Sequence, residues 1–200
     1  ENTLIIFTSD NGSPQRDGTN MGGQIASVKK YDHDPSRPWK GMKADIWEGG
    51  HRVPFITSWP GKIVANTVNN QLVCLTDIIS SVASILEIPR KKDAMEDSRD
   101  ISPTLFKNNT PIREDLIHHS IDGTFAIRKG DWKLIEGVNA GGFSKGLKIE
   151  GIPVETKGQL YNITDDPSEG NNLYAKNEKK VHELSQLLNK YKNADRSSYE

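Results

Sequence analysis

The sequence has little cysteine and no long hydrophobic run, and these absences exclude several kinds of protein. Its single cysteine among 200 residues, Cys74, excludes internal disulfide bonds and any metal site built from several thiolates. Cys74 lies between apolar residues, which favours a structural role over that of a nucleophile. No run approaches the roughly 18 consecutive apolar residues of a membrane-spanning helix, so no transmembrane segment is expected.

The charge is nearly balanced, which excludes a further group of partners. The 26 lysines and arginines against 27 aspartates and glutamates give a formal net charge of −1. Because no basic stripe accompanies this neutral balance, nucleic acid is not expected as a partner. An apolar content of 34% with 26% charged residues fits a globular chain, and 200 residues suffice for one domain or parts of two.

An apolar run followed directly by polar turn residues occupies residues 3–12 (TLIIFTSDNG). The run predicts a strand buried on both faces, as in a parallel sheet. Asp10 and Asn11 follow this strand, at the position where ligands gather in open α/β sheets. Their carboxylate and amide oxygens suit Ca²⁺ or Mg²⁺. The alternative is a plain turn, because Asp-Asn-Gly is good turn chemistry by itself.

A second polar stretch, residues 41–55 (GMKADIWEGGHRVPF), contains a lysine and a pair of glycines. The ammonium of Lys43 is a compact charge that suits sulfate or phosphate, although a single lysine is more often an ordinary surface residue. His51 follows the glycines and suits either a hydrogen bond to a substrate or a polar niche within the fold.

The rest of the chain alternates between strand and helix patterns. These predict strands over 53–59, 116–121 and 160–162, a hairpin over 125–135, and helices over 76–87 and after 177. His118 and His119 are adjacent on a predicted strand, so their rings point to opposite faces and cannot bind one metal ion together. His119 is the one expected at the rim of a site.

Four of these stretches, in this order and spacing, resemble the C-terminal portion of a formylglycine-dependent sulfatase, an arylsulfatase-like member of the alkaline phosphatase superfamily. They are the strand followed by S-D-N-G, the pattern K-x-x-x-x-E-G-G-x-R-x-P at 43–54, and the stretches 125–135 (FAIRKGDWKLI) and 159–167 (QLYNITDDP). The resemblance implies an α/β fold: part of a mixed α/β sheet domain over 1–110, and a small antiparallel-sheet subdomain with a C-terminal helix over 111–200.

The resemblance also implies roles for individual residues. Asp10 and Asn11 would be ligands of Ca²⁺ (or Mg²⁺), and Lys43 would be the catalytic lysine that binds sulfate. His51 and His119 are the expected substrate-binding residues, and the substrate would be a sulfated carbohydrate or an aryl sulfate.

One essential part of such a site is not in this sequence. The family makes its formylglycine nucleophile from a C/S-x-P-x-R motif, which the chain does not contain. We therefore expect the nucleophile in a missing N-terminal half of the same fold, with this chain a fragment that is inactive alone and binds calcium weakly. Enzymes of this family are usually periplasmic, secreted or lysosomal, and the fragment itself leaves the compartment unknown.

Two other functions remain open. A phosphoester or phosphonate hydrolase of the same superfamily is one, although its two-metal members often carry Asp-His in place of Asp10-Asn11. The other is a non-catalytic module that binds sulfated carbohydrate through the glycine-rich segment 137–158.

Overall fold

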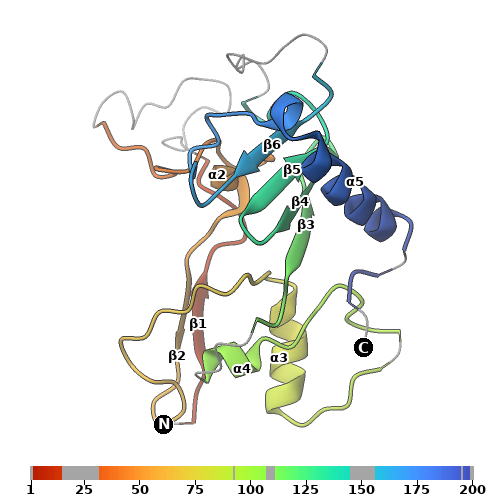
Figure 1. The fold of residues 1–200 in the computed structure, drawn as a ribbon. Helices are drawn as coiled ribbons and strands as arrows, with labels where there is room; N and C mark the ends of the chain where they lie inside the picture. Colours follow the sequence, from red (N-terminus) through yellow and green to blue (C-terminus); the bar gives the residue numbers. More distant parts are fainter. Residues whose placement is uncertain are drawn as a thin grey trace. The chain divides into compact units, whose positions relative to one another are not determined.

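The computed structural model describes residues 2–14, 32–91, 93–106, 111–144, 156–194 and 196–198 (Figure 1). The chain forms two compact units. Unit 1 comprises Glu1–Thr8, Pro54–Leu116 and Gln186–Glu200, and unit 2 comprises Ser9–Val53 and Ile117–Ser185. The predicted domain division at residue 110 stays a prediction. Within the described ranges, no helix combines the length and the apolar character needed to cross a membrane.

Unit 1 contains a two-stranded antiparallel sheet and two short helices. Strand β1 (Ile5–Thr8) pairs with β2 (Phe55–Ser58), and Phe7 lies opposite Ile56 in the register. The helices α3 (Asp77–Ile85) and α4 (Ser102–Leu105) follow in the chain. Apolar side chains from both strands and both helices line one small space: Leu4, Ile6, Phe55, Ile78, Val82, Ile85, Ile101 and Leu105. Both predicted strands and the predicted helix are confirmed.

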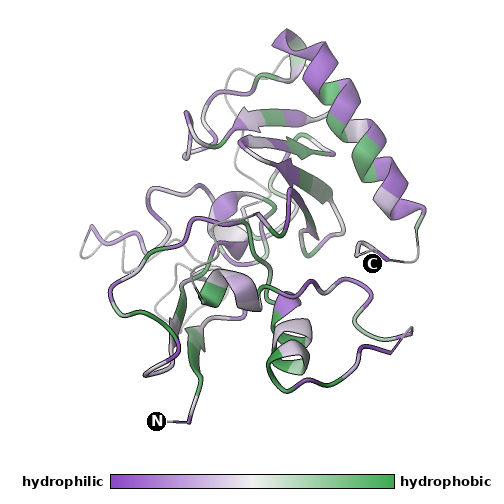
Figure 2. Cartoon of the chain, turned by 60° about the horizontal axis from the view of Figure 1, so that its bottom comes forward, coloured by the Kyte–Doolittle hydropathy of each residue, from purple (hydrophilic) through white to green (hydrophobic). Residues whose placement is uncertain are grey.

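The outer face of this sheet differs from the prediction. Ile5, Phe7 and Ile56 are 58%, 62% and 59% exposed. The expectation that the first strand lies in a parallel sheet and is buried on both faces is therefore wrong for the described chain. Figure 2 shows the hydrophobic residues of β1 in green. Because side chains alternate along a strand, such a run makes both faces apolar, but it does not identify what covers each face.

The start of α3 is held by the carboxylate of its first residue, Asp77. Thr76 occupies the cap position but makes no side-chain capping bond. The buried carboxylate of Asp77 instead accepts hydrogen bonds from the backbone N–H groups of Cys74 (2.8 Å) and Arg99 (2.9 Å). Asp77 also forms a buried ion pair with Arg113, so this helix buries a charged pair as well as apolar side chains.

Unit 2 is built on a four-stranded sheet in the order β3-β4-β5-β6. The strands are β3 (Asp115–His119), β4 (Phe125–Lys129), β5 (Trp132–Ile135) and β6 (Gln159–Asn162), and the β4–β5 and β5–β6 pairs are antiparallel. After the short helix η1 (Tyr174–Lys176) comes the long helix α5 (Glu178–Lys192), whose second half, from Gln186, belongs to unit 1. The predicted hairpin, short last strand and C-terminal helix are confirmed. The buried core cluster is Ile46, Trp47, Ala126, Ile135, Ala140, Tyr161 and Ile163.

A one-turn helix, α2 (Glu48–His51), occupies the E-G-G sequence. Its two glycines lie against neighbouring backbone. A Cβ added to Gly49 would lie 2.5 Å from the carbonyl oxygen of Gly41, and one added to Gly50 would lie 2.1 Å from that of Asp45. No real Cβ approaches so closely, so the close packing of this segment requires glycine at both positions.

The exposed outer face of β1 and β2 leads to a prediction about the isolated 200-residue chain. We expect the chain to bind the apolar dye ANS and to self-associate, because a contiguous apolar patch is exposed. Replacing the opposed pair by serine (Phe7→Ser with Ile56→Ser) should lower dye fluorescence and shift the chain toward monomer. Fluorescence titration and sedimentation measure this. Unchanged dye binding in this double variant would contradict the exposure of the face.

Candidate functional site

The Asp10-Asn11 turn lies against the segment that carries Lys43. The N–H of Gly12 donates to the carbonyl of Gly50 at 2.9 Å, and the N–H of Lys43 donates to the carbonyl of Ser13 at 2.9 Å. A Cβ at Gly12 would lie 1.9 Å from the carbonyl oxygen of Gly49, so glycine is needed for the approach. The structure thus brings together two predicted parts of the site that are well separated in the sequence.

The side chains of this turn offer oxygen ligands. Asp10 is exposed and Asn11 is half-buried. The amide nitrogen of Asn11 donates to the Gly12 carbonyl at 3.1 Å, which leaves its Oδ1 as an acceptor. The Ser9 hydroxyl donates to the Asn11 carbonyl at 2.9 Å and steadies the turn. A carboxylate and an amide oxygen fit a hard cation such as Ca²⁺ or Mg²⁺.

The two side chains offer the type of ligand that such a cation prefers, which is oxygen, but they are fewer than the cation needs. In the part of the chain that the structure describes, no group of three or more His, Cys, Asp or Glu side chains is arranged to hold a metal ion. Because Ca²⁺ takes about six to eight oxygen ligands, an ion held by Asp10 and Asn11 would need further ligands from other sources.

The predicted residue His119 ends a strand that leads to the Lys43 turn. The N–H of Ile121 donates to the carbonyl of Ala44 at 3.0 Å, next to Lys43. His119 itself is exposed, and its Nδ1 lies 2.8 Å from the Ser120 carbonyl oxygen. The two adjacent histidine rings have different neighbours, because the His118 ring lies against His51 and the His119 ring lies near Phe125. The segments of Asp10, Asn11, Lys43 and His119 therefore meet around one turn.

His51 lies in a group of buried charged and aromatic side chains. Its Nε2 is 3.2 Å from Oε1 of Glu48, and its ring centroid is 3.8 Å from that of His118. Burial, together with the positive charge of Lys133, lowers the pKa of His51 from 6.5 to about 4. Burial also lowers the pKa of His118 well below 6.5, and the charges of His51 and Lys133 add to that shift. Both rings are therefore neutral at pH 7, and a role for His51 in substrate binding stays a prediction.

The centre of this group is the carboxylate of Glu48, which the sequence analysis did not single out. Nζ of Lys133 lies 3.0 Å from Oε1 of Glu48 and 3.0 Å from Oε1 of Glu169. On the other oxygen of Glu48, Nη1 of Arg52 lies at 3.0 Å and Nη1 of Arg128 at 3.4 Å. Lys133 and Glu169 are fully buried, and Glu48 is 2% exposed. We call these five residues the Glu48 cluster.

The two carboxylates of the cluster have opposite pKa shifts. Burial raises the pKa of Glu48, but the charge of Lys133, the hydrogen bond with His51 and the charge of Arg128 outweigh burial, so the pKa lies well below its usual range. For Glu169, burial is the largest effect and raises the pKa, and the negative charge of Glu48 raises it further. Glu48 is therefore firmly ionised and anchors the surrounding cations.

The local sequence around Lys133 does not indicate this cluster. Lys133 lies in β5 between the apolar residues Trp132 and Leu134. Because side chains alternate between the two faces of a strand, this pattern predicts that Lys133 points to a solvent-facing side of the sheet, whereas the structure buries it completely. Lys40 also belongs to this region, because its Nζ donates to the Glu169 carbonyl at 3.1 Å and lies 4.2 Å from the Trp47 ring centroid. A buried lysine cannot be recognised from its neighbours in the sequence.

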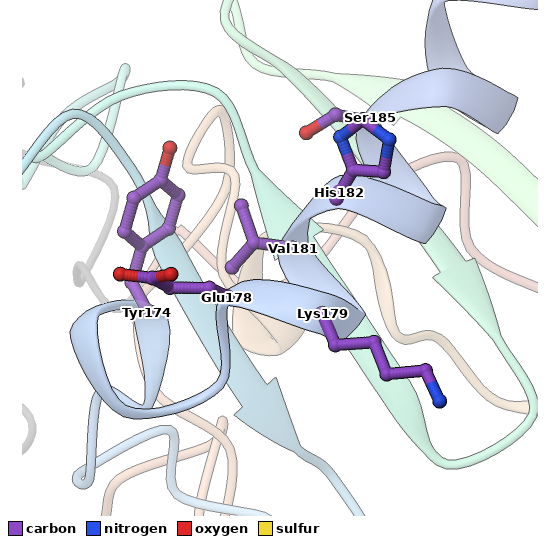
Figure 3. A pocket seen from close by; sticks show the side chains of 6 residues that line it. All are labelled: Tyr174, Glu178, Lys179, Val181, His182 and Ser185. Carbon is purple, nitrogen blue, oxygen red and sulfur yellow. The ribbon is translucent and has the colours of Figure 1, made fainter.

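A separate hollow of about 550 Å³ lies at the start of α5 (Figure 3). It contains none of the sequence-predicted site residues. Its lining combines a tyrosine and a histidine ring with side chains of both charge signs: Tyr174, Glu178, Lys179, Val181, His182 and Ser185.

The formylglycine nucleophile does not fit any stretch of this chain. The nearest sequences, residues 36–40 (SRPWK) and 58–62 (SWPGK), have lysine where the C/S-x-P-x-R motif has arginine. Ser36 is buried, at 5% exposure. The described residues therefore supply no formylglycine.

Comparison with known proteins identifies the family. Residues 1–88 match the Sulfatase family model. The N-acetylgalactosamine-6-O-sulfatase of Bacteroides thetaiotaomicron is 36% identical over 192 residues, which cover 96% of this chain. The chain belongs to the sulfatase family. It spans 37% of the length of that relative, and 22% of a sea-urchin arylsulfatase (Hemicentrotus pulcherrimus) that is 32% identical over 133 residues.

Solved structures agree with the fold of this sulfatase chain. A structure from a study of glycosaminoglycan metabolism by Bacteroides thetaiotaomicron has a TM-score of 0.79 at 35% identity, with 96% of this chain and 39% of that chain covered. The PsFucS1 sulfatase from a Pseudoalteromonas species has a TM-score of 0.67 at 29% identity, with 98% and 39% covered. The predicted fold, a mixed α/β chain with antiparallel sheets and a C-terminal helix, is confirmed.

The Glu48 cluster predicts a large stability effect at Lys133. Replacing this buried cation (Lys133→Met) leaves Glu48 and Glu169 facing each other, and should cost about 3–5 kcal/mol of unfolding free energy. Lys180, which pairs with Glu183 at the surface, is the matched control: Lys180→Met should cost less than about 1 kcal/mol. Urea unfolding measures both. Equal losses would show that the cluster does not stabilise the fold.

The histidine pair predicts loss of stability in mild acid. The pKa of His51 is about 4 in the folded state against an ordinary 6.5, so the unfolded chain binds more protons between these values. Stability should therefore fall as the pH drops from 6.5 toward 4, by on the order of 2 kcal/mol from this residue. His118 acts in the same direction, the contribution of Glu48 is lost only below its usual pKa, and Glu169 acts in the opposite direction.

Two variants separate this effect from general acid sensitivity. His51→Gln should flatten the dependence of unfolding free energy on pH between 6.5 and 4. His182→Gln, which changes an exposed histidine in the hollow at the start of α5, should leave that dependence unaltered. A His51 variant with the full pH dependence would contradict the depressed pKa.

Proposed function

We propose that this protein hydrolyses sulfate esters, with Lys43 binding the sulfate and Asp10 and Asn11 holding a divalent cation. The main support is the pairing of the two turns through the Lys43–Ser13 and Gly12–Gly50 backbone hydrogen bonds, both 2.9 Å long. They put an ammonium group and two oxygen ligands on adjoining backbone segments. This combination suits a doubly charged oxyanion held between a metal ion and a lysine.

Each residue has a separate role in this proposal. The ammonium of Lys43 pairs with the sulfate oxygens and offsets the negative charge that develops on the leaving oxygen. The oxygens of Asp10 and Asn11 hold Ca²⁺ (or Mg²⁺), which when bound supplies positive charge to the sulfate. His119, exposed at the end of β3, contacts the part of the substrate that carries the sulfate, and His51 is the second candidate for such a contact.

The nucleophile of the reaction lies outside this chain in our proposal. Two observations support this: the sequence has no C/S-x-P-x-R motif, and the chain spans only 37% of its Bacteroides relative. Activity would then belong to a longer protein that contains these 200 residues together with the formylglycine segment and further metal ligands.

We propose a sulfated carbohydrate, specifically a sulfated N-acetylhexosamine of the glycosaminoglycan type, as the substrate. The support is the 36% identity to a protein named N-acetylgalactosamine-6-O-sulfatase and the similar structure from a study of glycosaminoglycan metabolism. An aryl sulfate is the alternative, since an arylsulfatase is also similar. Comparing sulfate release from the two substrate classes decides between them.

The lysine role is tested in the full-length gene product. Lys43→Ala should lower kcat/KM for a 6-sulfated N-acetylgalactosamine by about 100- to 1000-fold, as expected for loss of a preorganised charge at the reacting group. Lys43→Arg should restore part of the activity, because charge returns without the compact ammonium. Lys180→Ala, a change away from this turn, should leave kcat/KM unchanged. An active Lys43→Ala enzyme would contradict the assignment.

A further inference from the structure

The backbone around Lys43 is fixed by hydrogen bonds on both sides. The N–H of Lys43 donates to Ser13, and the carbonyl of Ala44 accepts from the N–H of Ile121. The N–H of Asp45 donates back to the carbonyl of Met42 at 3.0 Å and closes the turn. These hydrogen bonds therefore fix the position of the Lys43 Cα atom, from which the side chain extends.

One buried side chain fastens this turn from within. Oδ2 of Asp45 accepts a hydrogen bond from the N–H of Met42 at 2.9 Å, and Oδ1 accepts one from the N–H of Ser144 at 2.9 Å. Asp45 is only 3% exposed. A carboxylate that accepts from backbone N–H groups makes charge-assisted hydrogen bonds, which are stronger than neutral ones. Asp45 thus links the two ends of the Lys43 turn to the backbone at Ser144.

The turn needs such fastening because its backbone is unfavourable. Ala44 has a φ of +78°, a conformation disfavoured for any residue with a Cβ. The neighbouring segment also lies directly on the turn: a Cβ added to Gly142 would lie 2.3 Å from the Ala44 carbonyl oxygen. Without the Asp45 carboxylate, the N–H groups of Met42 and Ser144 would lose their acceptor and the turn could relax.

We infer that Asp45 is a positioning residue for Lys43: its carboxylate holds the turn in the conformation that directs the lysine ammonium to the sulfate. This rests on the proposed role of Lys43 and adds to it a residue that does not itself touch the substrate. Residues 137–144 of the glycine-rich segment also help to shape the sulfate subsite in this inference, because the N–H of Ser144 donates a hydrogen bond to Asp45.

The inference is tested by a double-mutant cycle in the full-length enzyme. Asp45→Ala should lower kcat/KM for the sulfated sugar by about 10- to 100-fold, since a small displacement of a reacting group costs that much. On the Lys43→Ala background the same change should cause little further loss, because Asp45 acts through Lys43. Asp45→Asn, which keeps one acceptor oxygen in the same place, should retain part of the activity.

Binding of inorganic sulfate gives a second measurement that destabilisation alone would not alter. The inhibition constant for sulfate, measured well below the melting temperature of each variant, should rise in Asp45→Ala and rise less in Asp45→Asn. If Asp45→Ala does not fold, Asp45→Asn carries both measurements. Independent losses in the cycle, or an unchanged inhibition constant, would overturn the inference.

Asp77 supplies a matched control for this cycle. Like Asp45 it is buried and accepts from two backbone N–H groups, but it lies in unit 1. Any fold-loss of kcat/KM caused by Asp77→Asn should therefore be independent of Lys43, so that the double variant shows the product of the two single fold-losses. If Lys43→Ala alone leaves activity unchanged, the proposed function of Lys43 fails. If Lys43→Ala is impaired and Asp45→Ala adds its full loss to it, only the role of Asp45 fails.

Discussion

The buried carboxylate of Glu48 is the interaction on which the candidate site depends. It pairs with Lys133 at 3.0 Å and with Arg52 at 3.0 Å, and the backbone N–H of Glu48 donates to Glu169 at 2.6 Å. Charges removed from water are costly, so each of these groups is stable only while its partners remain. The cluster therefore fixes α2 to the four-stranded sheet of unit 2, and with it the segment that carries Lys43.

Two kinds of bond thus hold the residues that the proposed chemistry requires. Side-chain charges fix the α2 end of the segment through Glu48. The turn around Lys43 is fixed by the Asp45 carboxylate and by two backbone hydrogen bonds, one donated by Lys43 to the Ser13 carbonyl and one donated by Ile121 to the Ala44 carbonyl. Because the turn is held in this way, the charge of Lys43 is already in position before the proposed reaction begins. Electrostatic stabilisation by preorganised charges is usually the largest single contribution to catalysis.

The sequence predicted the local elements and the motif residues, because both depend on nearby residues. Alternation located the strands around Phe125 and Trp132, and the order of motifs located Asp10, Asn11 and Lys43. The Glu48 cluster was not predictable, since Lys133 and Glu169 reach Glu48 from 85 and 121 residues away. The antiparallel partner of β1 was missed for the same reason, because pairing is a long-range property that an apolar run does not specify.

The most direct test of the account is the preference of the full-length protein between sulfate and phosphate esters of the same sugar. Release of inorganic sulfate from a 6-sulfated N-acetylgalactosamine is compared with release of phosphate from its 6-phosphate analogue, both with Ca²⁺ present. The account predicts that kcat/KM for the sulfate ester is much the larger. Equal turnover, or a preference for the phosphate ester, would contradict the central claim that this protein is a sulfate ester hydrolase.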